Sequence, residues 1–507
     1  MDNSDRTGTQ PTGAHAAGAQ QSQGVQAAAA QAAGAQQSQG AQAAAAQPAA
    51  AQPAGTQPAG TRRSGLQRFR SSVAIRMAQL ATWASKKAGR GAGGMIGGLV
   101  GGAIDPQLMA SLGAGKGGTK RPTVLVTGTN GKSTTTRMLA SAVRTAATVC
   151  TNEGGDNMDA GVISALLAGR DADTVVLEVD ELHVPNIAEK LDADVLVLLN
   201  LSRDQLDRVG EINKIERALR ACVEARPNMR VIANCDDVSI TSAAWDSPNV
   251  QWVSAGFGWT GDSTSCPRTE GAIIHRTGED GVVDWFAAKK LPDGREFRRP
   301  TPDWRITDEG LIDREGTLHP MNLTLPGNAN RGNATQAVAA AVAVGELLAQ
   351  GTEHSAPATP AISTEQAIAA AEKVDNVAGR YSVVRFGNHE VRLMLAKNPA
   401  GWQEALSMVD RTADSLVISV NGQVADGQDL SWLWDVRFES FEGVHVVAAG
   451  ERGTDLAVRL GYASVEHNLI KDTVEAIRSC PPGRVEVLAN YTAFRDLKRM
   501  LDKEGDA

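Results

Sequence analysis

Cysteine is scarce in this chain of 507 residues, and its thiols do not come in closely spaced pairs. Without paired spacing or a preceding signal-peptide pattern, a disulfide framework is not expected, and a reducing cytoplasm is favoured. Long apolar runs are also lacking, since the most apolar stretch, Gly91 to Ile104, is about half as long as a membrane-spanning helix. We therefore expect no transmembrane anchor. The cysteines are Cys150, Cys222, Cys235, Cys266 and Cys480.

Positive charge is in deficit, with a formal net charge of -8 at pH 7. Nucleic-acid binding depends on a basic surface that neutralises phosphates, so this balance argues against nucleic acid as the main partner. The length is too great for one hydrophobic core and suggests about three domains.

Large apolar residues are almost missing from residues 1–64, which consist mainly of Ala, Gln, Gly, Ser, Pro and Thr. A sixteen-residue unit, GAQQSQGVQAAAAQAA, starts at Gly18 and recurs in nearly the same form from Gly34. Such a segment cannot offset its own ordering entropy by burial, so it is expected to be a disordered tail. A binding arm is the alternative.

Between Gly65 and Lys87, apolar residues then recur at helical spacing and predict an amphipathic helix. They include Val73, Met77, Leu80 and Trp83.

The rest of the chain predicts an α/β protein with a mostly parallel, doubly wound sheet and a second, C-terminal α/β domain. We expect a central domain over residues 65–375, with a small β insert at about 252–304, and a C-terminal domain over 376–507. Central strands are predicted at 123–127, 174–179, 193–199 and 230–233, and helices at 133–145, 334–348 and 364–373. C-terminal strands are predicted at 391–395, 415–419, 444–448 and 484–488.

The stretch TVLVTGTNGKSTTTRML, residues 123–139, has the features of a phosphate-binding loop. Glycines allow backbone N–H groups to approach a polyphosphate, the following helix N-terminus carries partial positive charge, and a lysine can reach the outer phosphates. Ser133 or Thr134 would supply a hydroxyl to Mg²⁺. The TGTNGK[ST]T form is shorter than the common loop and resembles the ATP site of the Mur ligase superfamily.

Acidic residues follow the next strand, in the run Glu178-Val179-Asp180-Glu181. An ATP site that activates a carboxylate needs a carboxylate of its own to hold Mg²⁺, and Glu178 is the best candidate. A further polar segment, NLSRDQLDRVGE from Asn200, follows another strand and so lies at the same edge of the sheet.

Several separate segments resemble the MurT-type subunit of lipid II isoglutaminyl synthase, over about residues 65 to 500. They are NLSRDQLDRVGE, TNEGGDNMDAG from Thr151, LPGNANRGNA from Leu325, AKNPAGW from Ala396, DGQDLSWLWD from Asp426, GERGTDLAVRLGYA from Gly450 and NYTAF from Asn490.

The resemblance implies a synthetase subunit that binds ATP and Mg²⁺ in its central domain. It would phosphorylate the D-glutamate α-carboxylate of the lipid II stem peptide, and ammonia released from glutamine by a GatD-type glutaminase would then form D-isoglutamine. Such a protein would work in the cytoplasm and meet its lipid substrate at the inner face of the membrane. The implied nucleotide-binding residues are Gly128, Thr129, Asn130, Gly131, Lys132, Ser133, Thr134 and Asn330, with Asn157, Arg203 and Asp204 on the substrate side.

The resemblance also implies that an aspartate is lent to the partner, where it would orient the histidine of a Cys-His pair. Asp426, Asp429 and Asp435 are the candidates, and the sequence does not choose among them. Where relatives often have Asn-Asp, this chain has Asn421-Gly422.

Two further departures from the family pattern are visible. Gln205 stands where Mur ligases usually have a histidine that binds magnesium. MurT-type proteins commonly carry a four-cysteine zinc ribbon in the insert, but here Cys266 stands without the other three cysteines. We therefore expect no zinc, and an insert held instead by Trp259, Trp285, Phe286 and Trp304.

None of the cysteines has the context of a glutaminase nucleophile, so ammonia is expected to come from a partner subunit. Two competing hypotheses remain. One is a Mur or folylpolyglutamate-type ligase that adds an amino acid, and the other is a catalytically silent scaffold subunit.

Overall fold

The computed structural model of this chain describes most of the sequence from residue 65 onward. The predicted tail, residues 1–64, lies outside the described residues. In the described part of the chain, no helix is both long and apolar enough to cross a membrane. The described residues are 65–87, 94–115, 119–152, 156–203, 211–256, 263–278, 283–350, 361–375, 381–410, 412–413, 415–427, 429–441 and 444–505.

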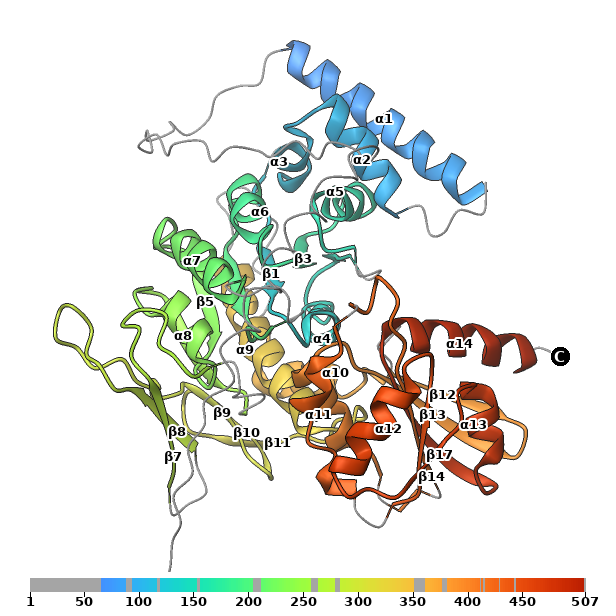
Figure 1. Ribbon diagram of the computed structural model, residues 1–507. Helices are drawn as coiled ribbons and strands as arrows, with labels where there is room; N and C mark the ends of the chain where they lie inside the picture. The colour runs from blue at the N-terminus through green and yellow to red at the C-terminus, as the bar shows by residue number, and fades with distance from the viewer. Residues whose placement is uncertain are drawn as a thin grey trace, which may run out of the picture. The chain divides into compact units, whose positions relative to one another are not determined.

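The predicted amphipathic helix is present as α1 (Gly65–Lys87), but the apolar residues on which that prediction rests, Val73, Met77, Leu80 and Trp83, are exposed. Its buried side consists of small residues, Ala74 and Ala78, which lie against α2 (Gly94–Ile104). The two helices approach closely because α2 presents glycine: a Cβ on Gly97 would come within 2.1 Å of the Thr82 hydroxyl. Helices α1, α2, α3 (Leu108–Gly113) and α5 (Asp159–Ala168) are neighbours in Figure 1.

The central sheet has the strand order β11-β10-β9-β6-β5-β4-β1-β3-β2 in the described part of the chain. Strands β1 to β6 pair in parallel, as predicted for a doubly wound sheet, while β9, β10 and β11 form an antiparallel edge. Their bounds are β1 Thr123–Thr127, β2 Val149–Cys150, β3 Thr174–Glu178, β4 Val195–Leu198, β5 Arg230–Asn234, β6 Val250–Ser254, β9 Trp304–Ile306, β10 Gly310–Ile312 and β11 Leu318–Pro320.

Helices cover both faces of this sheet, which is why the central strands read as continuous apolar runs. One face carries α4 (Lys132–Val143), α9 (Asn328–Gln350) and α10 (Thr364–Ala371). The other carries α5, α6 (Val184–Leu191), α7 (Glu211–Glu224) and α8 (Val238–Ala244). Helix α9 begins six residues before the predicted helix at 334, so the LPGNANRGN segment runs directly into it.

A two-stranded hairpin, β7 (Ile273–Thr277) with β8 (Val283–Ala287), lies between β6 and β9 in the chain. Its small core joins Trp285 and Phe297, whose ring centroids are 5.3 Å apart, to the buried Cys266. Of the predicted packing residues, Trp285 lies in this core, whereas Phe286 is outside it and lies under the Arg276 guanidinium, and Trp304 belongs to the core of the central sheet. Trp259 lies outside the described residues.

We predict that the purified protein contains no stoichiometric zinc, because a structural zinc needs four ligands and Cys266 is packed among apolar side chains. Elemental analysis after exhaustive dialysis would measure the metal content. One retained zinc per chain would contradict this reading of the insert.

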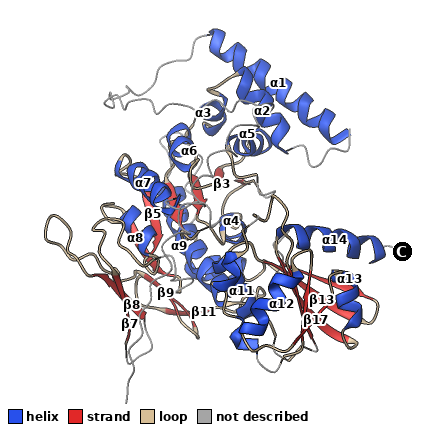
Figure 2. Ribbon diagram, in the orientation of Figure 1, coloured by secondary structure: helices blue, strands red, loops and turns tan. Residues whose placement is uncertain are grey.

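The C-terminal sheet has the order β12-β13-β17-β14-β15-β16, with only the β12–β13 pair antiparallel among its described strands. Helices α11 and α12 contribute to the buried cluster on one face, and α13 and α14 to that on the other. Figure 2 shows these helices on either side of the strands. The bounds are β12 Tyr381–Phe386, β13 His389–Leu395, β14 Ser415–Ser419, β15 Val446–Ala449, β16 His467–Leu469, β17 Gly483–Ala489, α11 Pro399–Met408, α12 Gly453–Tyr462, α13 Thr473–Ser479 and α14 Tyr491–Gly505.

Candidate functional site

The loop between β1 and α4 has the backbone shape that a phosphate cradle requires. Gly128 and Gly131 have φ values of 141° and 85°, a region that favours glycine. Space is also restricted: a Cβ on Gly128 would lie 2.9 Å from the backbone nitrogen of Asn200, and one on Gly131 would lie 2.4 Å from Asn333 Oδ1. Glycine is therefore required at both positions for conformation and for space.

Lys132 opens helix α4 and folds back over the loop. Its Nζ lies 2.6 Å from the carbonyl oxygen of Gly128 and 3.2 Å from Glu181 Oε1. Lys132 and Glu181 are both buried, so the ammonium is held at the loop by a desolvated carboxylate. Glu181 is thus a partner of the lysine rather than a free acid at the strand end.

Ser133 and Glu178 meet across neighbouring strand ends. Ser133 Oγ donates to Glu178 Oε2 at 2.8 Å, and Asn157 Nδ2 donates to the other carboxylate oxygen at 3.2 Å. Asn152 fixes the backbone there, accepting from Glu178 N at 2.8 Å and donating to Glu178 O at 2.7 Å. The structure therefore brings together three residues that the sequence placed at the nucleotide, metal and substrate positions.

The pair of Ser133 and Glu178 fits Mg²⁺, which in nucleotide sites takes one or two protein oxygens and completes its shell with phosphate and water. Within the described residues, no cluster of three or more His, Cys, Asp or Glu side chains is placed to hold a metal ion by protein ligands alone. These two residues would hold the ion, which would neutralise phosphate charge. Thr134 is buried within α4 and lies beside this pair in sequence.

Asparagine and threonine side chains form hydrogen bonds between the loop and the segment that follows strand β4. Asn200 Oδ1 accepts from Asn130 N at 2.9 Å, and Thr129 Oγ1 accepts from Ser202 N at 3.0 Å. Asn130 Nδ2 also lies 3.4 Å from Oδ1 of Asn398, the residue that caps helix α11. Asn398 belongs to the AKNPAGW segment, so the loop contacts the beginning of the C-terminal sheet's first helix.

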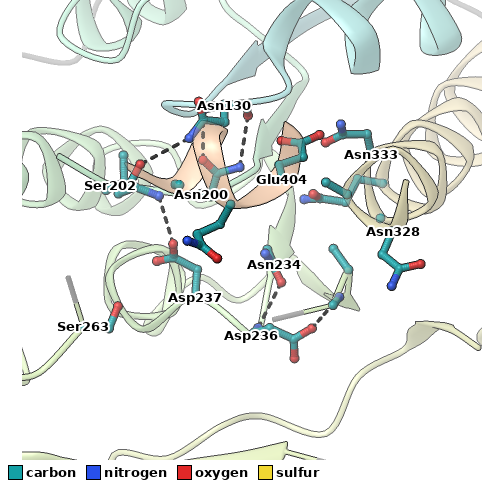
Figure 3. Close-up of a pocket in the computed structure, with 18 of the residues that line it drawn as sticks. Asn130, Asn200, Ser202, Asn234, Asp236, Asp237, Ser263, Asn328, Asn333 and Glu404 are labelled. Carbon is teal, nitrogen blue, oxygen red and sulfur yellow. Dashed lines mark hydrogen bonds between the residues drawn. The ribbon is translucent and has the colours of Figure 1, made fainter. Parts of the chain in front are cut away.

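A polar cavity of about 300 Å³ lies beside Asn130. Side-chain amides and carboxylates from β5, α9 and α11 point into it, as Figure 3 shows for Asn234, Asn333 and Glu404. Asp236 is held at its edge by Arg299 Nε at 2.7 Å and Gly256 N at 2.8 Å. The other polar residues of its lining include Asn200, Ser202, Asp237, Ser263, His275, Asn328, Gln336, Gln403 and Ser407.

The predicted nucleotide residue Asn330 is not among those that line this cavity. Its side chain donates to the carbonyl oxygen of Pro326 at 2.6 Å, within the first turn of α9. Asn333, one turn further, lines the cavity and also lies against Gly131. Sequence reasoning missed Asn333 although it sits in the same segment, since only helix geometry shows which of the neighbouring asparagines points inward.

Arg203 and Asp435, predicted for different roles, form a loose ion pair, with Arg203 Nη2 3.7 Å from Asp435 Oδ2. Asp204 and Gln205 lie outside the described residues. Asp435 follows a short 3₁₀ helix, η2 (Ser431–Trp434). The pair links the segment after β4 to the DGQDLSWLWD segment.

The other two candidate aspartates have local structural partners. Asp426 accepts from Thr492 N at 2.9 Å and also bonds the Thr492 hydroxyl, near the start of α14. Asp429 Oδ1 accepts from Ser431 N at 2.8 Å, a bond that lowers the pKa of this exposed carboxyl group. Glu451, which sequence reasoning missed, lies 3.4 Å from Gly422 N and accepts from Gln423 Nε2 at 2.9 Å. It puts an exposed carboxylate beside Gly422, the position at which the family resemblance leads us to expect an aspartate.

Four of the five cysteines lie in environments that disfavour the thiolate. Burial raises the pKa of Cys150 to about 11, and it also raises the pKa of Cys222, Cys235 and Cys480. A glutaminase nucleophile must react as the thiolate, so these environments oppose that role.

Two family models match the chain: the Mur ligase middle domain over residues 126–341 and the MurT ligase C-terminal domain over residues 395–494. The first contains the loop, Glu178 and most of the cavity, and the second contains the three candidate aspartates. The chain belongs to the MurT-type Mur ligases.

Two relatives of this MurT-type protein carry the name lipid II isoglutaminyl synthase (glutamine-hydrolyzing) subunit MurT. The protein from Streptococcus pneumoniae is 26% identical over 414 residues, covering 75% of this chain and 86% of the relative. That from Staphylococcus aureus (strain COL) is 23% identical over 404 residues, covering 75% of this chain and 87% of the relative. Their names describe a subunit of a larger enzyme.

Solved structures show the same fold at low identity. A pseudomurein peptide ligase type C from Methanothermus fervidus superimposes with a TM-score of 0.58 at 16% identity, covering 76% of this chain and 79% of that one. A UDP-N-acetylmuramoylalanyl-D-glutamyl-2,6-diaminopimelate–D-alanyl-D-alanyl ligase from Acinetobacter baumannii gives 0.52 at 17% identity, covering 80% and 79%. The MurT-type protein thus has a Mur-ligase-like fold, as the sequence predicted.

Proposed function

We propose that this protein is the synthetase subunit of a lipid II isoglutaminyl synthase, which uses ATP to convert the D-glutamate α-carboxylate of the lipid II stem peptide into the amide. The proposal rests on the combination of a phosphate loop formed by glycines with the Ser133–Glu178 pair. Both occur in a chain that has a MurT-type C-terminal domain. The ATP site, the metal pair and the acceptor side would then lie along one sheet edge.

The nucleotide would extend along this edge from the cavity to the loop. Its nucleoside would occupy the cavity, where side-chain amides such as Asn234 and Asn333 offer donors and acceptors. Its phosphates would lie over the backbone N–H groups after Gly128, with Lys132 on the outer phosphate in competition with Glu181. Ser133 and Glu178 would hold Mg²⁺, which would offset phosphate charge.

The reaction would proceed in two balanced steps. A carboxylate oxygen of the acceptor attacks the γ-phosphorus of ATP, forming an acyl phosphate and releasing ADP. Ammonia then attacks the carbonyl carbon, and inorganic phosphate leaves together with a proton from nitrogen. Lys132 would act in the first step by offsetting charge on the transferred group. Asn157, which donates to Glu178, would face the acceptor carboxylate in this arrangement.

Ammonia would come from a GatD-type glutaminase bound to the C-terminal domain. Trp434 and Tyr462 form an exposed aromatic pair, with ring centroids 5.2 Å apart and 56% and 75% of their surface accessible. Exposed aromatic clusters are typical of protein interfaces. Trp434 directly precedes Asp435 in the chain. A partner bound to the aromatic pair would therefore lie close to at least one candidate aspartate.

The two competing hypotheses predict different substrates. An amino-acid ligase would release ADP only when an amino acid is supplied, and a scaffold would release none. Purified protein would therefore be incubated with ATP, Mg²⁺ and lipid II, with ammonium chloride or a panel of amino acids as the nitrogen source. We expect ADP and the lipid II amide, detected by mass spectrometry, with ammonium alone. ADP formation that requires an amino acid would refute the proposal.

A further inference from the structure

We propose that the outward face of helix α1 is a docking surface for an anionic membrane, on which the helix lies parallel to the lipid headgroups. We call this face the α1 apolar stripe. It consists of Phe69, Val73, Met77, Leu80 and Trp83.

Exposure of the stripe is far greater than a core-facing role would allow. Phe69, Leu80 and Trp83 have 70%, 57% and 61% of their surface accessible. The stripe residues follow one another at intervals of three or four, so they share one side of the helix. Contact with α2 is made instead by Ala74 and Ala78, which leaves the large side chains to face away from the fold. Exposed large apolar side chains gathered on one helix face mark an interaction site, and the exposed Arg76 lies on the same face.

Charge decides between the kinds of partner. No acidic residue occurs between Arg6 and Asp105, whereas basic residues cluster within and beside α1. Arg76 is exposed on α1, and Lys87 Nζ lies 5.1 Å from the centre of the Trp83 ring. The chain as a whole is negative, so this concentration of positive charge is local. The basic residues are Arg62, Arg63, Arg68, Arg70, Arg76, Lys86, Lys87 and Arg90.

An apolar helix face with aromatic residues and surrounding cations is the arrangement that binds lipid surfaces. The apolar side chains enter the boundary between headgroups and acyl chains, while lysine and arginine remain among the anionic headgroups. A protein partner or a second copy of this chain would need matching acidic groups, and light scattering distinguishes association of two copies from binding to lipid.

The full chain would be mixed with vesicles of phosphatidylcholine alone or with added phosphatidylglycerol, and bound protein would be measured by co-sedimentation. We expect binding to the anionic vesicles that weakens as salt is raised, and little binding to the neutral ones. Trp83 emission, obtained by difference from a Trp83→Phe variant, should shift to shorter wavelength on binding.

Two variants separate the apolar and charged contributions. A triple change of Phe69, Leu80 and Trp83 to serine should weaken binding by at least about a hundredfold, because three large side chains lose their burial. Changing Arg76 and Lys87 to glutamine should weaken it about twenty-five-fold, at roughly fivefold per cation. The matched control replaces exposed apolar residues of other elements, Leu318, Val383 and Met500, with serine and should bind normally.

Equal binding by the triple variant and its control would overturn the proposal, as would equal binding to neutral and anionic vesicles. Light scattering would show whether the stripe instead joins two copies of the chain. The proposal would also be overturned if the triple variant lost such self-association and the unchanged chain did not bind vesicles. If the triple variant does not fold, the charge variant and the Trp83 signal still decide. The vesicles contain neither lipid II nor ATP, so the result is independent of the proposed function.

Discussion

Replacing Lys132 with methionine is expected to reduce lipid II-dependent ADP formation by about a thousandfold, because the ammonium would no longer offset phosphate charge. Methionine preserves most of the side-chain volume in this buried position. The variant would be assayed at saturating ATP and Mg²⁺ with ammonium chloride as nitrogen source. Glu178→Gln should produce a comparable loss that added Mg²⁺ relieves only in part.

The contact between Lys132 and Glu181 complicates a single substitution, since removing the lysine leaves a buried carboxylate without its partner. The double variant Lys132→Met with Glu181→Gln removes that charge, so it should recover thermal stability without recovering activity. Lys120→Ala is a matched control, because Lys120 also pairs with acids, Asp192 and Asp194, but it precedes strand β1 whereas the loop follows that strand. Near-native rates in the Lys132 variants would show that the proposed ATP site is wrong.

Replacement of one aspartate in the C-terminal domain is expected to stop the use of glutamine without stopping the use of ammonium. An asparagine cannot stabilise a histidine cation, so glutamine-dependent amidation should fall by about 10⁴. Supplied ammonium should restore the rate, because Lys132 and Glu178 are unchanged. Asp426→Asn, Asp429→Asn and Asp435→Asn would each be co-purified with the glutaminase and assayed with both nitrogen sources.

The structure separates these three candidates by what else each one holds. Asp426 binds two groups of Thr492, so its variant should also lose thermal stability. Asp435 is paired with Arg203, while Asp429 is exposed and hydrogen-bonds only Ser431, two residues along the chain, among its described contacts. We favour Asp429 for this reason. Full glutamine-dependent activity in all three variants would exclude a donated aspartate and direct the test to Glu451→Gln. A loss that ammonium does not rescue would place the residue in the synthetase chemistry.

Local patterns were enough to predict the phosphate loop and the neighbourhood of Glu178. Both lie at the ends of adjacent parallel strands, where Val126 pairs with Glu178, and this geometry follows from the alternation of strands and helices. The parallel pairing of β1 to β6 agrees with that alternation, but their order in the sheet was not predicted from the sequence. The antiparallel edge formed by β9 to β11 was not predicted, because its strands have three residues each and carry little periodicity.

The cavity could not be predicted, because its residues come from segments that only the tertiary fold brings together. Asn130 and Gln403 lie far apart in the chain, and nothing in either local sequence indicates the other. The orientation of α1 could not be predicted either. Helical spacing identified its apolar stripe, but the side that packs was decided by Ala78 against the glycine of α2.

The contact of Asn130 with Asn398 has a thermodynamic consequence. These residues are 268 positions apart, and they join the phosphate loop to the start of α11. A ligand that stabilises Asn130 in this arrangement also stabilises the present placement of α11. Because linkage is reciprocal, a protein that binds the C-terminal domain and favours that placement must raise the affinity of the loop for its ligand. The factor equals the one by which the ligand raises the affinity for that protein. Nucleotide affinity measured with and without a bound partner would therefore report how strongly the two halves of the chain communicate.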